Sequence, residues 1–422
     1  MSQTAGATTA KSWKSPSAGA AVIILLTILA YLPVTRGGFF WDDHLLITEN
    51  PMIKASDGLS RFWFTTEAPD YYPLTWSVLW LEWRMWGANA SGYHVVNVLL
   101  HAACAMLVWL VLRRLRIPGA WLAALIFAVH PVNVAAVGWI SEQKSTLSML
   151  FYAAAILLYL EFDEHHRWRW YGLSLAAFLL ALLSKSAVVM LPVVLLACGW
   201  WRRGQVERRD VACALPFFAL SLLAGVSTVW FVYSHAMQWR TIRTADFAGR
   251  LAAAGWPPWF YLFKAVLPFN LNVIYPKWEI DPGRLVSWLP TALLIGCFLV
   301  FWWKRKSWGW AALFGLGYFT VTLFPVFGFF DQPFYRFSLV ADHWQYYSIA
   351  GVIALAVAAG ERVCRKIPGA GASSVKVVAS ILVLTVLTAA TWTRASLYAD
   401  ADSLWRDTFA KNPKAQAAQS YP

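Results

Sequence analysis

Two adjacent carboxylates, Asp42 and Asp43, follow the first long apolar run of the chain, inside the aromatic sequence FFWDDH that begins at Phe39. A carboxylate acts as a general base when it is held within hydrogen-bond reach of the proton that it removes. In so apolar a chain, the pair indicates one of two things. Either it is a catalytic base with its partner at a lipid–water boundary, or it is an ordinary solvated turn.

Cationic side chains that could receive a negatively charged group lie far from this pair in the sequence. They are Lys144, Lys185, Arg336 and His343, and stabilising a leaving anion requires such groups. Lys185 ends an apolar run, so a snorkelling lysine is its alternative role. Arg336 has the alternative of pairing with Asp331 in the same loop.

Three further histidines have structural alternatives. His94 and His101 share one helical face with Asn97 between them, which is more typical of an interhelical hydrogen-bond seam than of a ligand set. His130 precedes Pro131 at an expected helix end, where capping or packing is favoured over a place in an acceptor or phosphate pocket.

The composition defines the kind of scaffold that must position these groups. Of 422 residues, 59% are hydrophobic and 14% are charged, which is typical of a polytopic membrane protein. The net charge of +13 does not indicate nucleic acid, because cytoplasmic loops of membrane proteins collect Lys and Arg. No phosphate-binding glycine motif is present, so a nucleotide is not expected as the direct substrate.

Eleven apolar runs are long enough to be membrane-spanning helices, so the expected fold is an all-α polytopic bundle. They are 18–35, 93–112, 119–137, 147–160, 170–184, 186–201, 211–233, 286–303, 308–327, 345–360 and 377–393. A twelfth run, 246–270, contains Arg250, Pro257, Pro258 and Lys264, so we expect it to be re-entrant or interfacial.

Basic residues predict the orientation of the bundle. Lys and Arg are about threefold denser in one alternate set of loops, which places that set and the amino terminus in the cytoplasm. Residues 1–17 are then a disordered cytoplasmic tail, 18–393 the transmembrane domain and 394–422 an extracytoplasmic tail. The first outer loop, 36–92, holds the acidic pair and is expected to form interfacial amphipathic helices.

Several long motifs resemble one family, the membrane O-mannosyltransferases with carboxy-terminal tetratricopeptide repeats and their bacterial relatives, within the type C glycosyltransferases. The motifs are Trp41–His44, Glu49–Pro51, Tyr72–Trp76, Trp86–His101, Phe127–Lys144, Leu183–Lys185 and Ala341–His343. The resemblance implies a type C glycosyltransferase fold in the membrane, here a bacterial inner membrane. It also implies transfer of a mannose-like hexose from a polyprenyl-phosphate donor to a protein or glycan hydroxyl on the periplasmic face.

The resemblance also implies roles for individual residues. Asp42 or Asp43 would be the catalytic base, and the other would orient it or hold a divalent cation such as magnesium or manganese. Expected contacts to the substrate phosphate are His44, His130, Lys144, Lys185, Arg336, Asp342 and His343. The expected acceptor and donor pocket contains Tyr72, Trp76, His94 and Glu142.

The chain departs from the family pattern in several places. The family usually has other residues at the positions of Gln143, Ser145, Ser186, His343 and Trp344, and a second repeat copy does not follow residue 398. Two alternatives therefore stay open beside the enzyme. One is a transporter or flippase of lipid-linked sugar, which would be expected to carry charges near the midplane and internal repeats. The other is an inactive scaffold.

Overall fold

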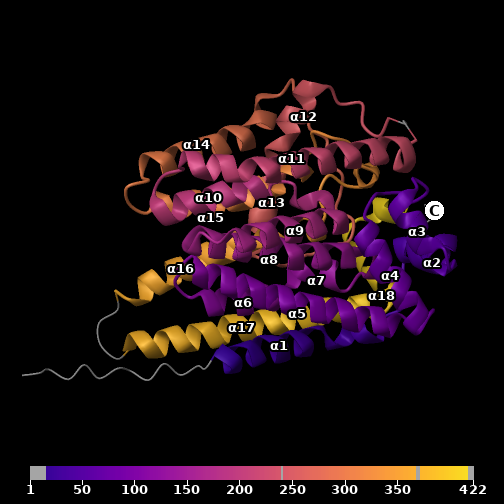
Figure 1. Ribbon diagram of the computed structural model, residues 1–422, viewed down its shortest axis with the longest axis horizontal. Coiled ribbons are helices and arrows are strands. Elements are labelled where there is room, and N and C mark those ends of the chain that lie inside the picture. The colour runs from indigo at the N-terminus through magenta and orange to yellow at the C-terminus, as the bar shows by residue number, and fades with distance from the viewer. Residues whose placement is uncertain (1–15, 239–240, 367–370, 417–422) are drawn as a thin grey trace, which may run out of the picture.

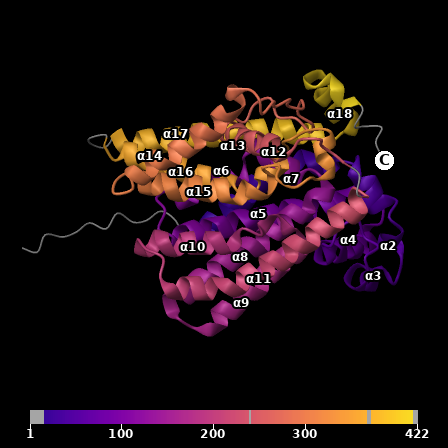
Figure 2. The same cartoon turned by 90° about the horizontal axis from the view of Figure 1, so that it is seen from above.

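The computed structural model describes residues 16–238, 241–366 and 371–416. They form an elongated bundle in which most of the long helices run side by side along one axis, with no strand among them (Figure 1). The view from above separates two groups of helices, one around α14, α15 and α16 and the other around α8, α9 and α11 (Figure 2).

Eight helical segments of the described chain are long and apolar enough to cross a membrane. They contain the helices α1 (Pro16–Tyr31), α5 (Ala90–Arg114), α8 (Gln143–His165), α10 (Leu191–Arg203), α11 (Arg208–Phe231), α14 (Leu289–Trp303), α15 (Gly309–Leu323) and α17 (Gly371–Tyr398). The chain is therefore an integral membrane protein, and the expected all-helical polytopic architecture is confirmed.

The expected count of eleven spans is not confirmed, because three of the eleven runs do not form one continuous helix of at least 18 residues. The run 119–137 is broken into α6 (Ala120–Ala128) and Pro131–Val137, which includes α7 (Val134–Val137), with a bend of 46°. Pro131 lacks an N–H and pushes the residue before it out of the helical region, which accounts for the break. The other two runs form α9 (Trp168–Ser184) of 17 residues and α16 (Ile349–Cys364) of 16.

The segment 246–270 forms two short helices, α12 (Phe247–Ala254) and α13 (Trp256–Val266). Pro257 and Pro258 lie in the first turn of α13, where a missing N–H costs no helical hydrogen bond. Neither helix reaches the length of a span, and in Figure 1 α13 is labelled near the centre of the bundle while α12 lies toward its upper edge. The segment behaves as predicted in that it does not cross as a single helix.

The first outer loop contains the expected short helices. They are α2 (Pro51–Lys54), α3 (Gly58–Phe64) and α4 (Pro73–Trp86), gathered at one end of the bundle (Figure 1). On α4, Trp76 and Leu79 are buried while Leu81 and Met85 are more than half exposed. An apolar face that the protein does not cover suits an interfacial helix.

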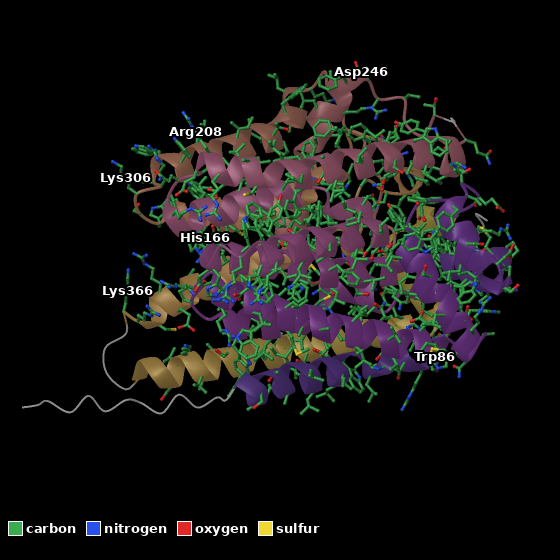
Figure 3. All side chains as sticks on the ribbon, in the orientation of Figure 1. Trp86, His166, Arg208, Asp246, Lys306 and Lys366 are labelled. Atoms are coloured by element: carbon green, nitrogen blue, oxygen red, sulfur yellow. The ribbon has the colours of Figure 1, made fainter. Side chains whose placement is uncertain are left out.

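The two ends of the bundle differ in charge, and each is named here for what it contains. The motif end holds α2 to α4 and Trp86, while the basic end holds His166, Arg208, Lys306 and Lys366 (Figure 3). Positive charge at one end of the spans is the pattern from which the cytoplasmic side is inferred.

The tail after α17 continues as the helix α18 (Ala401–Lys411). Trp405 of α18 packs edge-on against Trp41 at a ring distance of 5.5 Å, and Asp407 pairs with Arg394 of α17 at 3.0 Å. The tail is therefore folded onto the motif end. The predicted disorder of residues 1–17 falls almost entirely outside the described residues.

Candidate functional site

The acidic pair lies on a tight turn that precedes a short π-helical segment, His44–Thr48. Trp41 has a φ of +49°, a left-handed conformation that costs a non-glycine residue about 1–3 kcal/mol. Its indole compensates by lying parallel to that of Trp139, 5.4 Å away, with Phe334, Phe337 and Trp405 around it. Aromatic packing therefore stabilises the turn in a backbone conformation that is unfavourable by itself.

Asp43 points into the protein and stabilises the turn. Its Oδ2 accepts from the N–H of Phe40 at 3.2 Å, and its Oδ1 accepts from the N–H of Ser141 at 2.7 Å and from the Ser141 hydroxyl. Burial raises the pKa of Asp43 to about 7, although these hydrogen bonds favour the charged form. Asp43 thus joins the turn to the start of α8.

Asp42 is placed differently from its neighbour. Its side chain is partly exposed, and its pKa is raised first by burial and further by Glu142, while Lys144 lowers it. A carboxylate that feels Lys144 and Glu142 lies on the same side of the turn as the basic cluster around α8. Of the two aspartates, Asp42 is the one that interacts with that cluster and remains partly exposed.

Glu142 is the centre of that cluster. The Nζ of Lys185 lies 2.8 Å from its Oε2, and the Nζ of Lys144 and the Nε2 of His343 lie 3.6 and 3.7 Å from its Oε1. Ser145 donates to the Oε2 of Glu142 and accepts from Lys185. Glu142, at the carboxyl end of the η4 turn Ile140–Glu142, thereby gathers side chains from α8, from the α9–α10 corner and from the loop after α15.

The charges of this cluster do not cancel. Burial lowers the pKa of His343 to about 4, so its imidazole is neutral near pH 7. Two ammonium groups then face the one carboxylate of Glu142, and all of these side chains are less than one-fifth exposed. Asp42 and Asp70 also interact with Lys144, so the site gathers two cations and three carboxylates in a confined place, and its ammonium groups are what an anionic group could contact.

A third carboxylate, Asp70, flanks the cluster from the first loop. It accepts from the indole N–H of Trp76 at 3.0 Å, and its pKa is raised by burial but lowered by Lys144 and, more weakly, by Lys185. Nearby, the hydroxyl of Tyr72 lies 3.0 Å from the Oγ of Ser186. The expected pocket residues Tyr72 and Trp76 are thus at the site, Trp76 as a donor that orients Asp70.

Other expected phosphate ligands make contacts of a different kind. His130 accepts from the N–H of Val132 and lies 3.1 Å from the carbonyl of Ala265, so it caps the turn after α6. His44 is exposed and lies 3.2 Å from the hydroxyl of Thr48. For His130, this is the capping role that the sequence favoured.

Asp342 and Arg336 are the remaining expected phosphate contacts. Asp342 accepts from the hydroxyl of Tyr275 at 2.8 Å, and burial raises its pKa to about 6 against the lowering effect of Arg394. Arg336 was expected to have Asp331 as an alternative partner, but Asp331 forms its ion pairs with two other arginines, Arg243 and Arg250, at 2.6 and 2.7 Å.

The polar stripe along α5 is a packing seam. His94 is fully buried, and a Cβ on Gly37 would come within 3.0 Å of its Nε2. Asn97 donates to the carbonyls of Ala136 and Val137, and His101 lies 2.7 Å from the hydroxyl of Tyr346. These hydrogen bonds explain why Asn97 and His101 are tolerated within the bundle.

Three contributors to the site were not singled out from the sequence. Ser141 and Trp139 lie inside the longest motif, but the motif does not say which of its residues meet the acidic turn. Asp70 lies two residues before the YPLTW motif that begins at Tyr72. Its closeness to that motif is the feature of the sequence that could have indicated Asp70 as a site residue.

The geometry does not fit a divalent cation held between Asp42 and Asp43. Both oxygens of Asp43 accept hydrogen bonds from Phe40 or Ser141. Within residues 16–238, 241–366 and 371–416, no three His, Cys, Asp or Glu side chains converge as metal ligands would. What the site does contain is a carboxylate, Asp42, beside the two buried ammonium groups of Lys144 and Lys185 at the motif end.

A polytopic helical bundle with such a site defines a class of membrane protein that handles an anionic group at one membrane surface. Comparisons with known proteins narrow the class. Residues 70–230 match the family model described as dolichyl-phosphate-mannose-protein mannosyltransferase. That match covers α4 to α11 and includes Glu142, Lys144 and Lys185.

Similar curated proteins carry related names. A protein O-mannosyl-transferase of Caenorhabditis elegans, F38B6.6, is 29% identical over 158 residues, which are 34% of this chain and 23% of the relative. Tmtc1 of Drosophila melanogaster, also a protein O-mannosyl-transferase, is 31% identical over 195 residues, 43% of this chain and 22% of the relative. Human TMTC4, a protein O-mannosyl-transferase, is 29% identical over 164 residues, which are 33% of this chain and 22% of the relative.

Over these aligned residues the chain is therefore similar to membrane O-mannosyltransferases, as its motifs predicted. The aligned part of the chain spans less than a quarter of the length of these curated relatives. The all-helical bundle agrees with the type C glycosyltransferase fold expected for that family.

Proposed function

We propose that the protein transfers a mannose-like hexose from a polyprenyl-phosphate donor to a hydroxyl group of a protein or glycan at the motif end. The observation that carries the proposal is the arrangement of Asp42 beside the Glu142 cluster, which provides a carboxylate base and a cationic receiver for phosphate at one membrane surface. The family match and the relatives' names point to the same reaction class.

The reaction follows from these groups. The acceptor oxygen attacks the anomeric carbon of the sugar and forms the new glycosidic bond, while Asp42 takes the proton of the acceptor hydroxyl. The bond from the sugar carbon to the phosphate oxygen breaks, and the negative charge on the departing polyprenyl phosphate is stabilised by Lys144 and Lys185. Glu142 keeps both ammonium groups in place. Asp43 positions Asp42 through the turn and touches no substrate.

The base assignment is supported by the raised pKa of Asp42. A carboxylate whose pKa is closer to the working pH accepts a proton more readily than an ordinary one. By the distribution of basic loops, the motif end is the periplasmic side, with the amino terminus in the cytoplasm. A donor carried by the bilayer would present its phosphate at that surface.

The test compares two neighbouring substitutions in purified full-length protein supplied with polyprenyl-phosphate mannose and a hydroxyl acceptor. Asp42→Asn should lower the transfer rate by about 10²–10⁴-fold with unchanged thermal stability. Asp43→Asn should lower the unfolding temperature, because at least one of the hydrogen bonds from Phe40 and Ser141 loses its acceptor.

Asp57→Asn is the matched control, since Asp57 is an exposed carboxylate of the same loop. It should change neither transfer nor stability. Normal transfer by a stably folded Asp42→Asn protein would overturn the assignment of the base.

A further inference from the structure

A cavity of about 740 Å³ lies between α5, α8, α10, α15 and α16, away from Asp42 and the Glu142 cluster. Its walls are almost entirely apolar. They include Val108, Leu112, Ile156, Val194 and Ala354. Its volume falls in the range of roughly 300–1,000 Å³ that ligand sites usually have.

The cavity has a charged mouth at the basic end. Arg362 and Arg365 line it there, and both side chains are exposed. Glu361, the acidic residue beside them, is already paired with Lys376 of α17 at 2.6 Å. The mouth therefore keeps a surplus of positive charge.

Tryptophan rings surround the same opening. Trp201 and Trp308 line the cavity, and Trp201 donates from its indole N–H to the carbonyl of Leu115. Indole rings with an apolar body and a polar edge prefer the headgroup layer of a membrane. The opening thus has the features of a membrane surface, with an apolar interior behind it.

The opposite end of the cavity is closed below the Glu142 cluster. Tyr152 and Tyr318 line that end. Tyr318 donates to the carbonyl of Tyr347 at 3.0 Å, and Tyr152 meets the ring of Tyr347 edge-on at 6.1 Å. This layer of tyrosines separates the cavity from Lys185 and Ser145, so a molecule that enters at the basic end stops short of the proposed donor site.

We propose that this cavity binds a membrane lipid with an anionic headgroup from the leaflet at the basic end. One hydrocarbon chain fills the apolar interior, and the headgroup phosphate contacts Arg362 and Arg365. Basic pockets between helices on the cytoplasmic side recognise anionic headgroups in this way. The charge of the mouth favours this occupant over the donor lipid, whose phosphate would meet Lys144 and Lys185 at the motif end.

The headgroup is tested with two lipids that share the same chains. Full-length protein in neutral detergent, stripped of lipid, is titrated with dioleoylphosphatidylglycerol or dioleoylphosphatidylcholine, and binding is followed by native mass spectrometry and by the unfolding temperature. The anionic lipid should bind more tightly and raise the unfolding temperature more. In the double variant Arg362→Gln/Arg365→Gln, its affinity should fall about 30-fold, since each basic residue near a headgroup contributes roughly a factor of five.

The matched control removes two exposed positive charges from the same end but away from the cavity. It is Arg208→Gln/Lys306→Gln, and it should leave the preference for the anionic lipid intact. Equal binding of the two lipids by the wild type, or an unchanged preference in the Arg362→Gln/Arg365→Gln protein, would overturn the proposal.

The chain is tested by filling the cavity. Ala354→Phe should abolish binding of dioleoylphosphatidylglycerol. If the larger ring prevents folding, the milder Ala354→Leu is used instead, and it should weaken binding. Full binding by a folded Ala354→Phe protein would show that the chain lies elsewhere. Displacement of dioleoylphosphatidylglycerol by polyprenyl phosphate from the wild type would assign the cavity to the donor lipid and also contradict the proposal.

Discussion

The two ends of the bundle use the same kinds of charged side chain in different ways. At the basic end, Asp163 pairs with Arg202 and Arg203 at 2.7 and 2.6 Å, and Arg203 also reaches Asp210 at 2.6 Å. There, several partners of opposite sign share partly exposed surface. At the motif end, Glu142 is 5% exposed and alone holds both Lys144 and Lys185.

The difference lies in balance and burial rather than in residue type. Arg202 and Arg203 at the basic end are matched by carboxylates on neighbouring helices, which ties α8, α10 and α11 together. At the motif end, Lys144 and Lys185 are buried among Glu142, Asp42 and Asp70. Charges gathered in a buried place are costly, so they are a better sign of function than a larger number of exposed pairs.

The largest effect should come from removing the single anion at the centre of the motif end. Glu142→Gln removes the carboxylate that the buried Lys144 and Lys185 both contact, so we expect it to destabilise the protein by about 3–5 kcal/mol. Unfolding in detergent measures the change. Glu207→Gln at the basic end, where the side chain is 45% exposed, is the control and should have little effect, because the amide oxygen of Gln can still accept the capping hydrogen bond at the start of α11. Equal stability of the two variants would remove the contrast between the ends.

The next effect concerns the reaction itself. Lys144→Gln removes one of the two cations that receive the phosphate charge, so the rate of transfer should fall by about 10²–10³-fold. Because Lys144 lowers the pKa of Asp42, its loss raises that pKa, and the acid side of the pH–rate profile should move to higher pH. A profile of kcat/KM against pH checks both results. A lower rate with an unchanged acid limb would mean that Lys144 does not influence the pKa of the catalytic base.

A smaller effect is expected when a balanced pair is broken at the basic end. Arg203→Gln leaves Asp163 paired with Arg202 and leaves Asp210 only the backbone N–H of Glu207, so the loss of stability should be about 1–2 kcal/mol, with no change in transfer. Parallel measurements of unfolding and transfer test this. If Arg203→Gln lowered transfer as much as Lys144→Gln, the basic end would be part of the reaction machinery.

The smallest effect is a change in how the stability of the protein depends on pH, caused by one carboxyl group at the motif end. Glu82 of α4 is 3% exposed, accepts from the side-chain amide of Gln143 at 2.7 Å, and has a pKa raised by burial to about 8. The fold therefore favours its neutral form, whereas the unfolded chain loses this proton at the ordinary carboxyl pKa. Glu82 consequently lowers stability progressively as pH rises from that value to about 8.

Glu82→Gln is neutral at every pH and should flatten this part of the stability profile while raising stability near pH 8. Unfolding measured from about pH 5 to about pH 9 distinguishes the two proteins. An equally steep profile in the variant would mean that another group, such as Asp43, causes the slope.

Much of the scaffold could be predicted because it depends on local pattern. A run of about 20 apolar residues must satisfy its backbone as a helix in a membrane, so each of the eleven runs contains helix. The exact spans could not be predicted, since the break at Pro131 and the short lengths of α9 and α16 depend on packing against neighbouring helices.

The candidate site was predictable in part for a similar reason. Alternating spans bring every second loop to the same end, so Glu142, Lys185 and His343 could be expected to approach the first loop. The division between Asp42 and Asp43 could not be foreseen, because it depends on which carboxylate meets the backbone N–H of Ser141. Likewise, nothing in the sequence shows that Asp342 would meet Tyr275 instead.

The packing of Trp405 on Trp41 links the far end of the chain to the acidic turn. Any domain joined after α18 would begin close to the acidic turn, and its orientation would be set by the Trp405 indole and by the Asp407–Arg394 pair. A fused receptor, tag or repeat array would therefore stand beside the route by which acceptors reach the turn.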